Sequence, residues 1–170
     1  MAIKKRRLGI GFLNLLLFFT VLLLHYTVTA GLHIGKATPL AILPLLTAFS
    51  MFAPVSLSAL TGFFTGLTMD GIAGDLSCFN TLFLMLAAAL ISALADNLFN
   101  KNIRSAVVLS FLAAVFYFFF KWLCFYAFRA GMQDSLTYLL YYAIPSILYT
   151  EVFIFAFYPL YRRFDRMKGA

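Results

Sequence analysis

Five ionisable side chains fall inside or beside the long apolar stretches of this chain, and they are His25, Asp70, Asp96, Lys121 and Glu151. An ionisable group within a membrane span is costly, so it marks a functional site by default. The clearest pattern surrounds Asp70, because Gly62, Gly66, Asp70 and Gly74 recur at every fourth residue. On a helix this spacing forms one face, and small residues on such a face let another helix approach closely. We therefore predict a helix-packing face that carries one carboxylate.

Asp70 and Lys121 are predicted at the same depth, near the outer ends of two different spans. Because the two groups have opposite charge, an ion pair is one interpretation. In the alternative, Lys121 extends outward alone and Asp70 reaches the lipid headgroups. His25 lies at a similar depth and either joins this group or is an interface residue beside Tyr26.

Glu151 is predicted near the middle of the last span, with no cation at its depth. It could be protonated and hydrogen-bonded, contact a hydroxyl or a residue of a partner protein, or line a cavity. Asp96 is predicted at the inner end of its span, as an interfacial carboxylate close to Lys101 and Arg104.

The elements that must position these residues are membrane spans. The chain has 170 residues, of which 64% are hydrophobic and 11% charged, and its mean hydropathy is +0.96. Apolar runs of about 20 residues match the thickness of a bilayer. The fold class predicted is therefore an all-α polytopic membrane protein, a compact single domain without a soluble part. The net charge of +7 gathers at both ends of the chain, which favours topology and membrane lipid headgroups over nucleic acid.

Six transmembrane helices are predicted, at about 8–30, 39–53, 54–74, 78–98, 104–128 and 136–160. The second is the weakest, since Pro39 and Pro44 interrupt it, and a single broken helix there would leave five spans. Six spans with both termini cytoplasmic place ten basic residues inside and two outside, as the positive-inside rule requires. The first apolar run is longer than the core of a signal peptide, so it is predicted to be an uncleaved span.

No catalytic motif accompanies these spans. The sequence contains no GxSxG or HExxH element and no phosphate-binding loop. No metal site, cofactor or enzymatic activity is therefore expected. The two cysteines, Cys78 and Cys124, lack a CxxC or Cys/His neighbour, and buried free thiols are favoured over a disulfide.

The central region, residues 44–86, resembles the MreD family of small polytopic rod-shape-determining proteins of the bacterial cytoplasmic membrane. That family carries a glycine-rich helix of the form GxxxGLxxD, a short loop and an apolar helix. Here the motif is Gly62, Gly66, Leu67 and Asp70, followed by the run from Cys78 to Leu86. The ending FYPLYRRFDR, residues 157–166, is similar to the close of the family.

The resemblance implies a non-enzymatic scaffold of the cell-elongation machinery. Such a protein binds MreC and helps couple MreB filaments to peptidoglycan synthesis by RodA and a class B penicillin-binding transpeptidase. It also implies a fold similar to that of the substrate-binding components of energy-coupling-factor vitamin transporters. The alternative function is therefore such a component, which would require a vitamin-sized pocket with a few polar groups.

Two roles remain open for the glycine face. It packs against a helix, which is either a neighbour in the bundle or the membrane anchor of MreC. In the second role Asp70 fixes the orientation of the partner by finding one polar group. The aromatic run Phe116–Phe120 is interpreted as lipid-facing bulk or as a partner-helix surface.

Overall fold

The computed structural model describes residues 18–21, 40–73, 78–99, 101–127 and 139–169. These residues form helices joined by short turns, and no strand occurs among them. The main helices are α2 (Ile42–Ser50), α3 (Val55–Ala73), α4 (Phe79–Asn97), α5 (Ile103–Trp122), α7 (Ile144–Val152) and α8 (Ile154–Gly169). Two π-helical turns, Leu123–Ala127 and Leu139–Ala143, follow α5 and precede α7.

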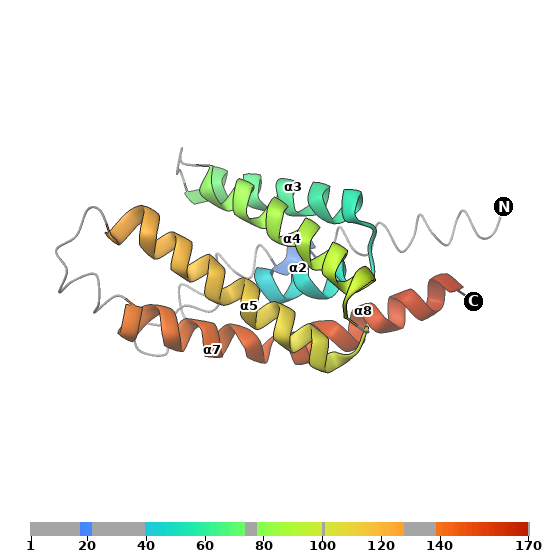
Figure 1. The fold of residues 1–170 in the computed structure, drawn as a ribbon. Coiled ribbons are helices and arrows are strands. Elements are labelled where there is room, and N and C mark those ends of the chain that lie inside the picture. Colours follow the sequence, from blue (N-terminus) through green and yellow to red (C-terminus); the bar gives the residue numbers. More distant parts are fainter. Residues whose placement is uncertain (1–17, 22–39, 74–77, 100, 128–138, 170) are drawn as a thin grey trace.

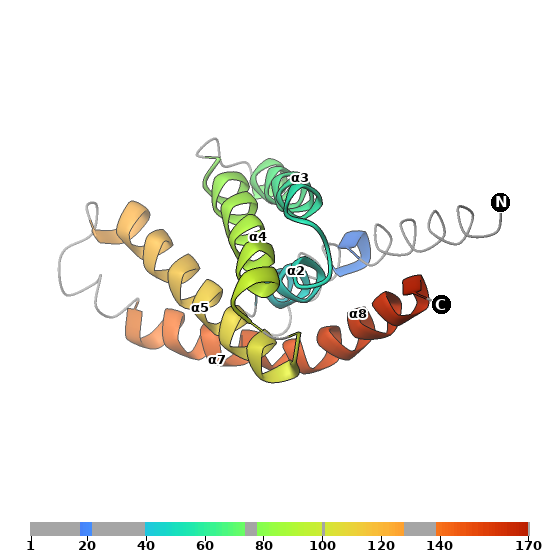
Figure 2. The same ribbon diagram turned by 45° about the vertical axis from the view of Figure 1, so that its right-hand side comes forward.

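Helix α2 forms the centre of the molecule. All nine of its residues are buried, and it contacts α3, α4, α5, α7 and α8. Figures 1 and 2 show it between the α3–α4 pair on one side and α5, α7 and α8 on the other. The backbone N–H of Leu40, just before α2, donates to the Thr150 hydroxyl of α7 at 2.9 Å. This bond fixes the beginning of the central helix to the last long helical segment.

The length of α2 differs from the predicted second span, 39–53. Nine residues rise about 14 Å, which is less than half of a hydrocarbon core of about 30 Å. The helix therefore does not cross a bilayer by itself. Its apolar residues are explained by burial inside the protein, and a turn at 51–54 separates it from α3. The region thus contains two helices, α2 and α3, and its number of membrane crossings stays a prediction.

Helices α3 and α4 form the closest pair in the molecule and lie side by side in both views (Figures 1 and 2). The ends of α3 and α4 agree with the predicted spans 54–74 and 78–98 to within one residue. The side of α3 that faces away from α4 is apolar and exposed, with Leu60, Phe64 and Leu67 among its residues.

Among the described residues, three helices are long and apolar enough to cross a membrane: Phe79–Asn97, Ile103–Phe125 and Tyr141–Arg166. The last combines α7 and α8, which are separated only at Phe153. Helix α8 continues to Gly169, about nine residues beyond the predicted end of the sixth span. The buried face of α8 carries Tyr158 before this boundary and Tyr161 and Phe164 after it, and Tyr161 contacts Phe49 of α2 edge to face. These aromatic contacts explain why the helix does not end at the apolar boundary.

Candidate functional site

The carboxylate of Asp70, in the last turns of α3, accepts four hydrogen bonds from the beginning of α4. The backbone N–H and the side-chain amide of Asn80 donate to Oδ1 at 3.2 Å and 2.8 Å. The backbone N–H and the hydroxyl of Thr81 donate to Oδ2 at 2.8 Å and 2.6 Å. Asp70 is only 4% exposed, so water does not replace these donors.

Asp70 has the role of a helix N-cap supplied by the neighbouring helix. The first N–H groups of any helix lack partners inside that helix, and they carry partial positive charge. The residue that precedes α4, Cys78, has a left-handed backbone with φ of 50° and makes no side-chain cap. A carboxylate from α3 therefore satisfies donors that the loop leaves unpaired. In a low-dielectric interior such charge-assisted bonds are stronger than neutral ones.

The hydrogen bonds continue from Asp70 to a third helix. The amide oxygen of Asn80 accepts a bond of 2.7 Å from the hydroxyl of Tyr117, a buried residue of α5. We call Asp70, Asn80, Thr81 and Tyr117 the polar latch. It joins α3, α4 and α5 at the end of the bundle where α4 begins, which we call the latch end.

The predicted ion pair between Asp70 and Lys121 is not formed. Both carboxylate oxygens of Asp70 are bound by Asn80 and Thr81 instead. The ammonium of Lys121 lies 5.7 Å from the centroid of the Tyr117 ring, a cation–π distance. Both charged groups thus adjoin the polar latch, in agreement with their predicted equal depth. The N–H groups at the beginning of α4 are the partner that the sequence interpretation did not consider.

The glycines of α3 pack against α4. A Cβ added to Gly62 would overlap the backbone carbonyl of Leu84 and lie 3.0 Å from the Cβ of Ala88. A Cβ added to Gly66 would lie 2.5 Å from the carbonyl oxygen of Asn80. Such contact is possible only for glycine, so this part of the predicted packing face is used within the bundle. Gly74 and His25, the other predicted residues of this region, lie outside the described residues.

Glu151 contacts a hydroxyl, which was one of the options left open for it. Ser110 of α5 donates to Oε1 at 3.0 Å, so the carboxyl group joins α5 to α7. The second oxygen, Oε2, is buried and has no hydrogen-bond partner among the described residues. Ser50 of α2 likewise has a buried hydroxyl oxygen without a partner.

The opposite end of the bundle gathers basic residues. Asp96 pairs with Lys101 at 3.0 Å, so its carboxylate lies beside one of the two basic residues predicted to be close to it. The hydroxyl of Tyr158 in α8 donates to the backbone oxygen of Lys101 at 2.6 Å. The α4–α5 turn and the basic part of α8 are therefore neighbours, and we call this the basic end.

Three residues of the polar latch, Asn80, Thr81 and Tyr117, were not singled out from the sequence. A carboxylate ten residues before a polar Asn-Thr pair at a helix start is a signal that could have identified two of them. The cysteines also differ from expectation: both thiols are free, as predicted, but Cys78 and Cys124 are exposed. No cluster of three or more His, Cys, Asp or Glu side chains suited to a metal ion occurs in the described part of the chain.

No protein-family model, curated protein or solved structure gives a significant match to this chain.

Proposed function

We propose that this chain is a non-enzymatic membrane scaffold of the MreD type. In this role it binds MreC and helps couple MreB filaments to the peptidoglycan-synthesising enzymes RodA and a class B penicillin-binding transpeptidase. The observation that carries the proposal is that the two glycines and the aspartate of the GxxxGLxxD segment all contact the same helix, α4. Gly62 and Gly66 bring α3 onto α4, and Asp70 caps α4. The residues that define the resemblance are thus those that hold the α3–α4 pair together.

The use of the carboxylates supports a role without catalysis. Asp70 is occupied by α4, Asp96 is paired with Lys101, and Glu151 is bound by Ser110. General acid–base chemistry generally needs titratable groups that can reach a substrate within hydrogen-bond distance. Each of these three carboxylates instead holds two segments of the same chain together.

We propose that the partner packs on a surface other than the glycine face. Because α4 covers Gly62 and Gly66, the MreC anchor does not pack on these two residues in the proposed complex. The exposed sides of the bundle are available instead, and they include Phe64 of α3 and Phe119 of α5. Of the two roles left open for the glycine face, we therefore propose packing inside the bundle.

The proposed location is the bacterial cytoplasmic membrane, with six crossings and both termini in the cytoplasm. The α4–α5 turn lies next to the basic part of α8. This supports the proposed topology, since both positively charged segments then lie on the cytoplasmic side. Helix α2 is too short for a crossing, so the proposed second crossing also needs residues before Leu40, which lie outside the described residues.

The transporter alternative gains no support from the groove between α4 and α5. This groove has a volume of about 630 Å³, large enough for a vitamin. Its lining residues are all apolar apart from the Cys124 thiol. A vitamin-binding pocket requires polar groups that fix the orientation of its ligand.

The cell-shape role is tested by depleting this protein in the rod-shaped bacterium that encodes it. Loss of rod shape, restored by the wild-type gene, is the expected result. Cells that keep their shape but lose uptake of a vitamin would overturn the proposal and favour the transporter alternative.

A further inference from the structure

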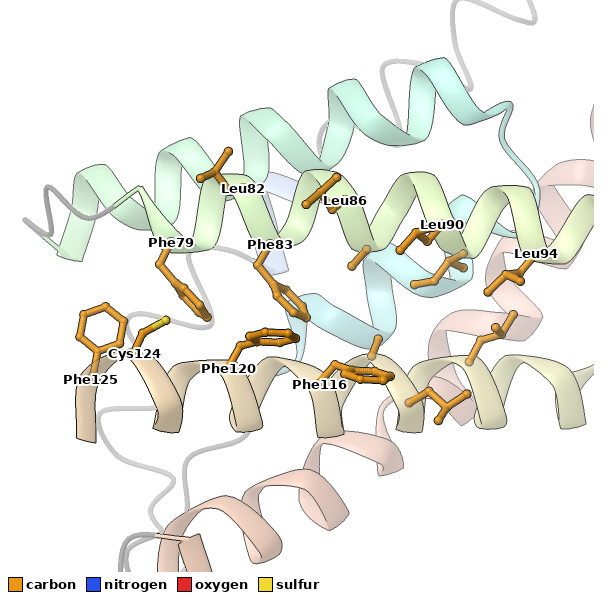
Figure 3. A pocket seen from close by; sticks show the side chains of 15 residues that line it. Phe79, Leu82, Phe83, Leu86, Leu90, Leu94, Phe116, Phe120, Cys124 and Phe125 are labelled. Atoms are coloured by element: carbon orange, nitrogen blue, oxygen red, sulfur yellow. The ribbon is translucent and has the colours of Figure 1, made fainter. Parts of the chain in front are cut away.

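The groove between α4 and α5 is lined by apolar residues from most of the length of both helices. Figure 3 shows Phe79 and Phe83 of α4 directed toward α5, with Phe116 and Phe120 of α5 opposite them. Along α4 the lining extends from Phe79 to Leu94, which corresponds to about 22 Å of helical rise. This length is most of a hydrocarbon core of about 30 Å. An occupant of the groove must therefore be apolar over nearly its whole length.

One end of this groove adjoins the basic end of the bundle. Leu94 lies one turn before the end of α4, and its carbonyl oxygen accepts the N–H groups of Leu98 and Phe99 in the α4–α5 turn. The next residues of the chain include Lys101 and Arg104, both exposed. The groove thus ends beside a positively charged turn.

Helix α8 adds further positive charge at this end. Because the Tyr158 hydroxyl is bonded to Lys101, the α8 side that carries Tyr158 faces the α4–α5 turn. Arg162 and Arg166 follow at intervals of four residues, so they lie on nearly the same side. We define the basic cluster as Lys101, Arg104, Arg162, Arg163 and Arg166. Its acidic neighbours are Asp96, paired with Lys101, and Asp165, so the cluster keeps a positive excess.

We propose that the groove and the basic cluster together bind one anionic phospholipid. An acyl chain lies along the α4–α5 groove, and the phosphate is held by the arginines of the basic cluster. Arginine presents a planar fork of donors that matches phosphate, and it keeps its charge under all physiological conditions. The charge complementarity at one end and the apolar lining along the rest correspond to the two parts of a single lipid molecule.

A second copy of the chain fits the groove less well. In a two-fold symmetric dimer the same patch meets itself, so two concave surfaces would face each other and leave unfilled space. An apolar helix of a partner would fill the groove without using the basic cluster. The lipid site is independent of the proposed scaffold function, because it needs no other protein.

The proposal is tested by native mass spectrometry of the full chain in mild detergent. The probes are dioleoyl-phosphatidylglycerol and dioleoyl-phosphatidylethanolamine, which share acyl chains and differ in net charge. At least tenfold tighter binding of the phosphatidylglycerol is expected. The double variant R162Q/R166Q should lose this preference while still binding both lipids weakly through the groove.

Two matched leucine substitutions test the groove itself. Leu86→Trp fills the groove from a side chain that is 56% exposed, whereas Leu60→Trp changes a leucine of α3 that is 54% exposed and lies outside the groove. Leu86→Trp should weaken binding of both lipids about tenfold, and Leu60→Trp should bind them as the wild type does. Equal binding of both lipids by the wild type, or wild-type binding by Leu86→Trp, overturns the proposal. Release of a co-purified helical peptide from the groove, in place of lipid, also overturns it.

Discussion

At the scale of single residues, the carboxylate of Asp70 is explained by backbone N–H groups rather than by another charged side chain. A helix N-terminus presents several donors with partial positive charge, and Asp70 binds two of them together with two side-chain donors. A carboxylate within a membrane span usually suggests a site for an ion or a proton. The carboxylate of Asp70 instead joins two helices of the same chain.

Asp70→Asn should destabilise the folded protein by about 2–3 kcal/mol, because an amide group replaces one of two acceptor oxygens with a donor. The Thr81 or Asn80 backbone N–H would then face an N–H group. Thermal unfolding in detergent measures the effect. Asp96→Asn is the control, since its ion pair with Lys101 is about half exposed and is worth about 0.5 kcal/mol or less.

The exchange of Asp70 and Lys121 tests the discarded ion pair with the same assay. The double variant should be no more stable than Asp70→Lys alone, since a lysine cannot accept the four bonds at α4. Recovery of wild-type stability in the exchanged protein would show that the ion pair exists after all.

Two buried serines that differ in their partners provide a second prediction. Ser110→Ala removes the only described donor to Glu151 and should cost about 1–3 kcal/mol. Ser50→Ala removes a buried hydroxyl oxygen that has no partner among the described residues, so stability should stay the same or rise. Unfolding midpoints of the two variants check this, and equal losses would contradict the assignment of the Glu151 contact.

At the scale of elements, the α3–α4 pair depends on glycine at two positions. Helix interiors disfavour glycine by about 1 kcal/mol relative to alanine, so the two glycines of this face weaken α3 as an isolated helix. Close backbone contact with α4 offsets this cost through dispersion and weak hydrogen bonds.

Gly66→Leu should separate α3 from α4 and prevent accumulation of folded protein, because the new side chain would collide with the backbone of Asn80 and Thr81. Gly71→Leu is the matched control one turn further on, where an added Cβ meets nothing within 4 Å, and it should fold normally. Fluorescence-detected size-exclusion chromatography compares the two. If both variants behave alike, the contact between α3 and α4 is not as described.

The ends of α3 and α4 lie within one residue of the predicted ends, since long apolar runs with flanking turns define them. Helix α5 ends at Trp122, six residues before the predicted end, and a π-helical turn continues it to Ala127. The sequence also indicated that the glycine face packs closely, but not against which helix. The sequence could not predict the backbone partners of Asp70, because every helix begins with unpaired N–H groups whatever its side chains are. The sequence also did not show that α2 is a buried helix too short to cross a membrane by itself, since a buried helix and a short membrane span have the same apolar composition.

At the scale of the whole molecule, two groups of polar residues lie at opposite ends of the bundle. The polar latch closes one end, and the basic residues of the α4–α5 turn and α8 occupy the other. Apolar helices connect the two ends, and among the described residues three of these helices are long and apolar enough to cross a membrane. In the proposed topology the latch end faces outward and the basic end faces the cytoplasm.

The exposed thiol of Cys78 reports this orientation. In whole cells a membrane-impermeant maleimide should label it, because it lies at the latch end just before α4. A variant with Asn102→Cys and both native cysteines replaced by serine should be labelled only after the membrane is opened, since Asn102 lies in the α4–α5 turn. The reverse pattern would contradict the proposed topology.

The proposed scaffold function is tested most directly by co-purification with MreC. The tagged full chain is isolated in mild detergent from the bacterium that encodes it, and the bound proteins are identified and quantified. We predict that MreC is recovered with the wild type and with Gly71→Leu in near-equal amounts. Folded wild-type protein that recovers no MreC, and instead recovers the ATPase subunits of a transporter, would contradict the account.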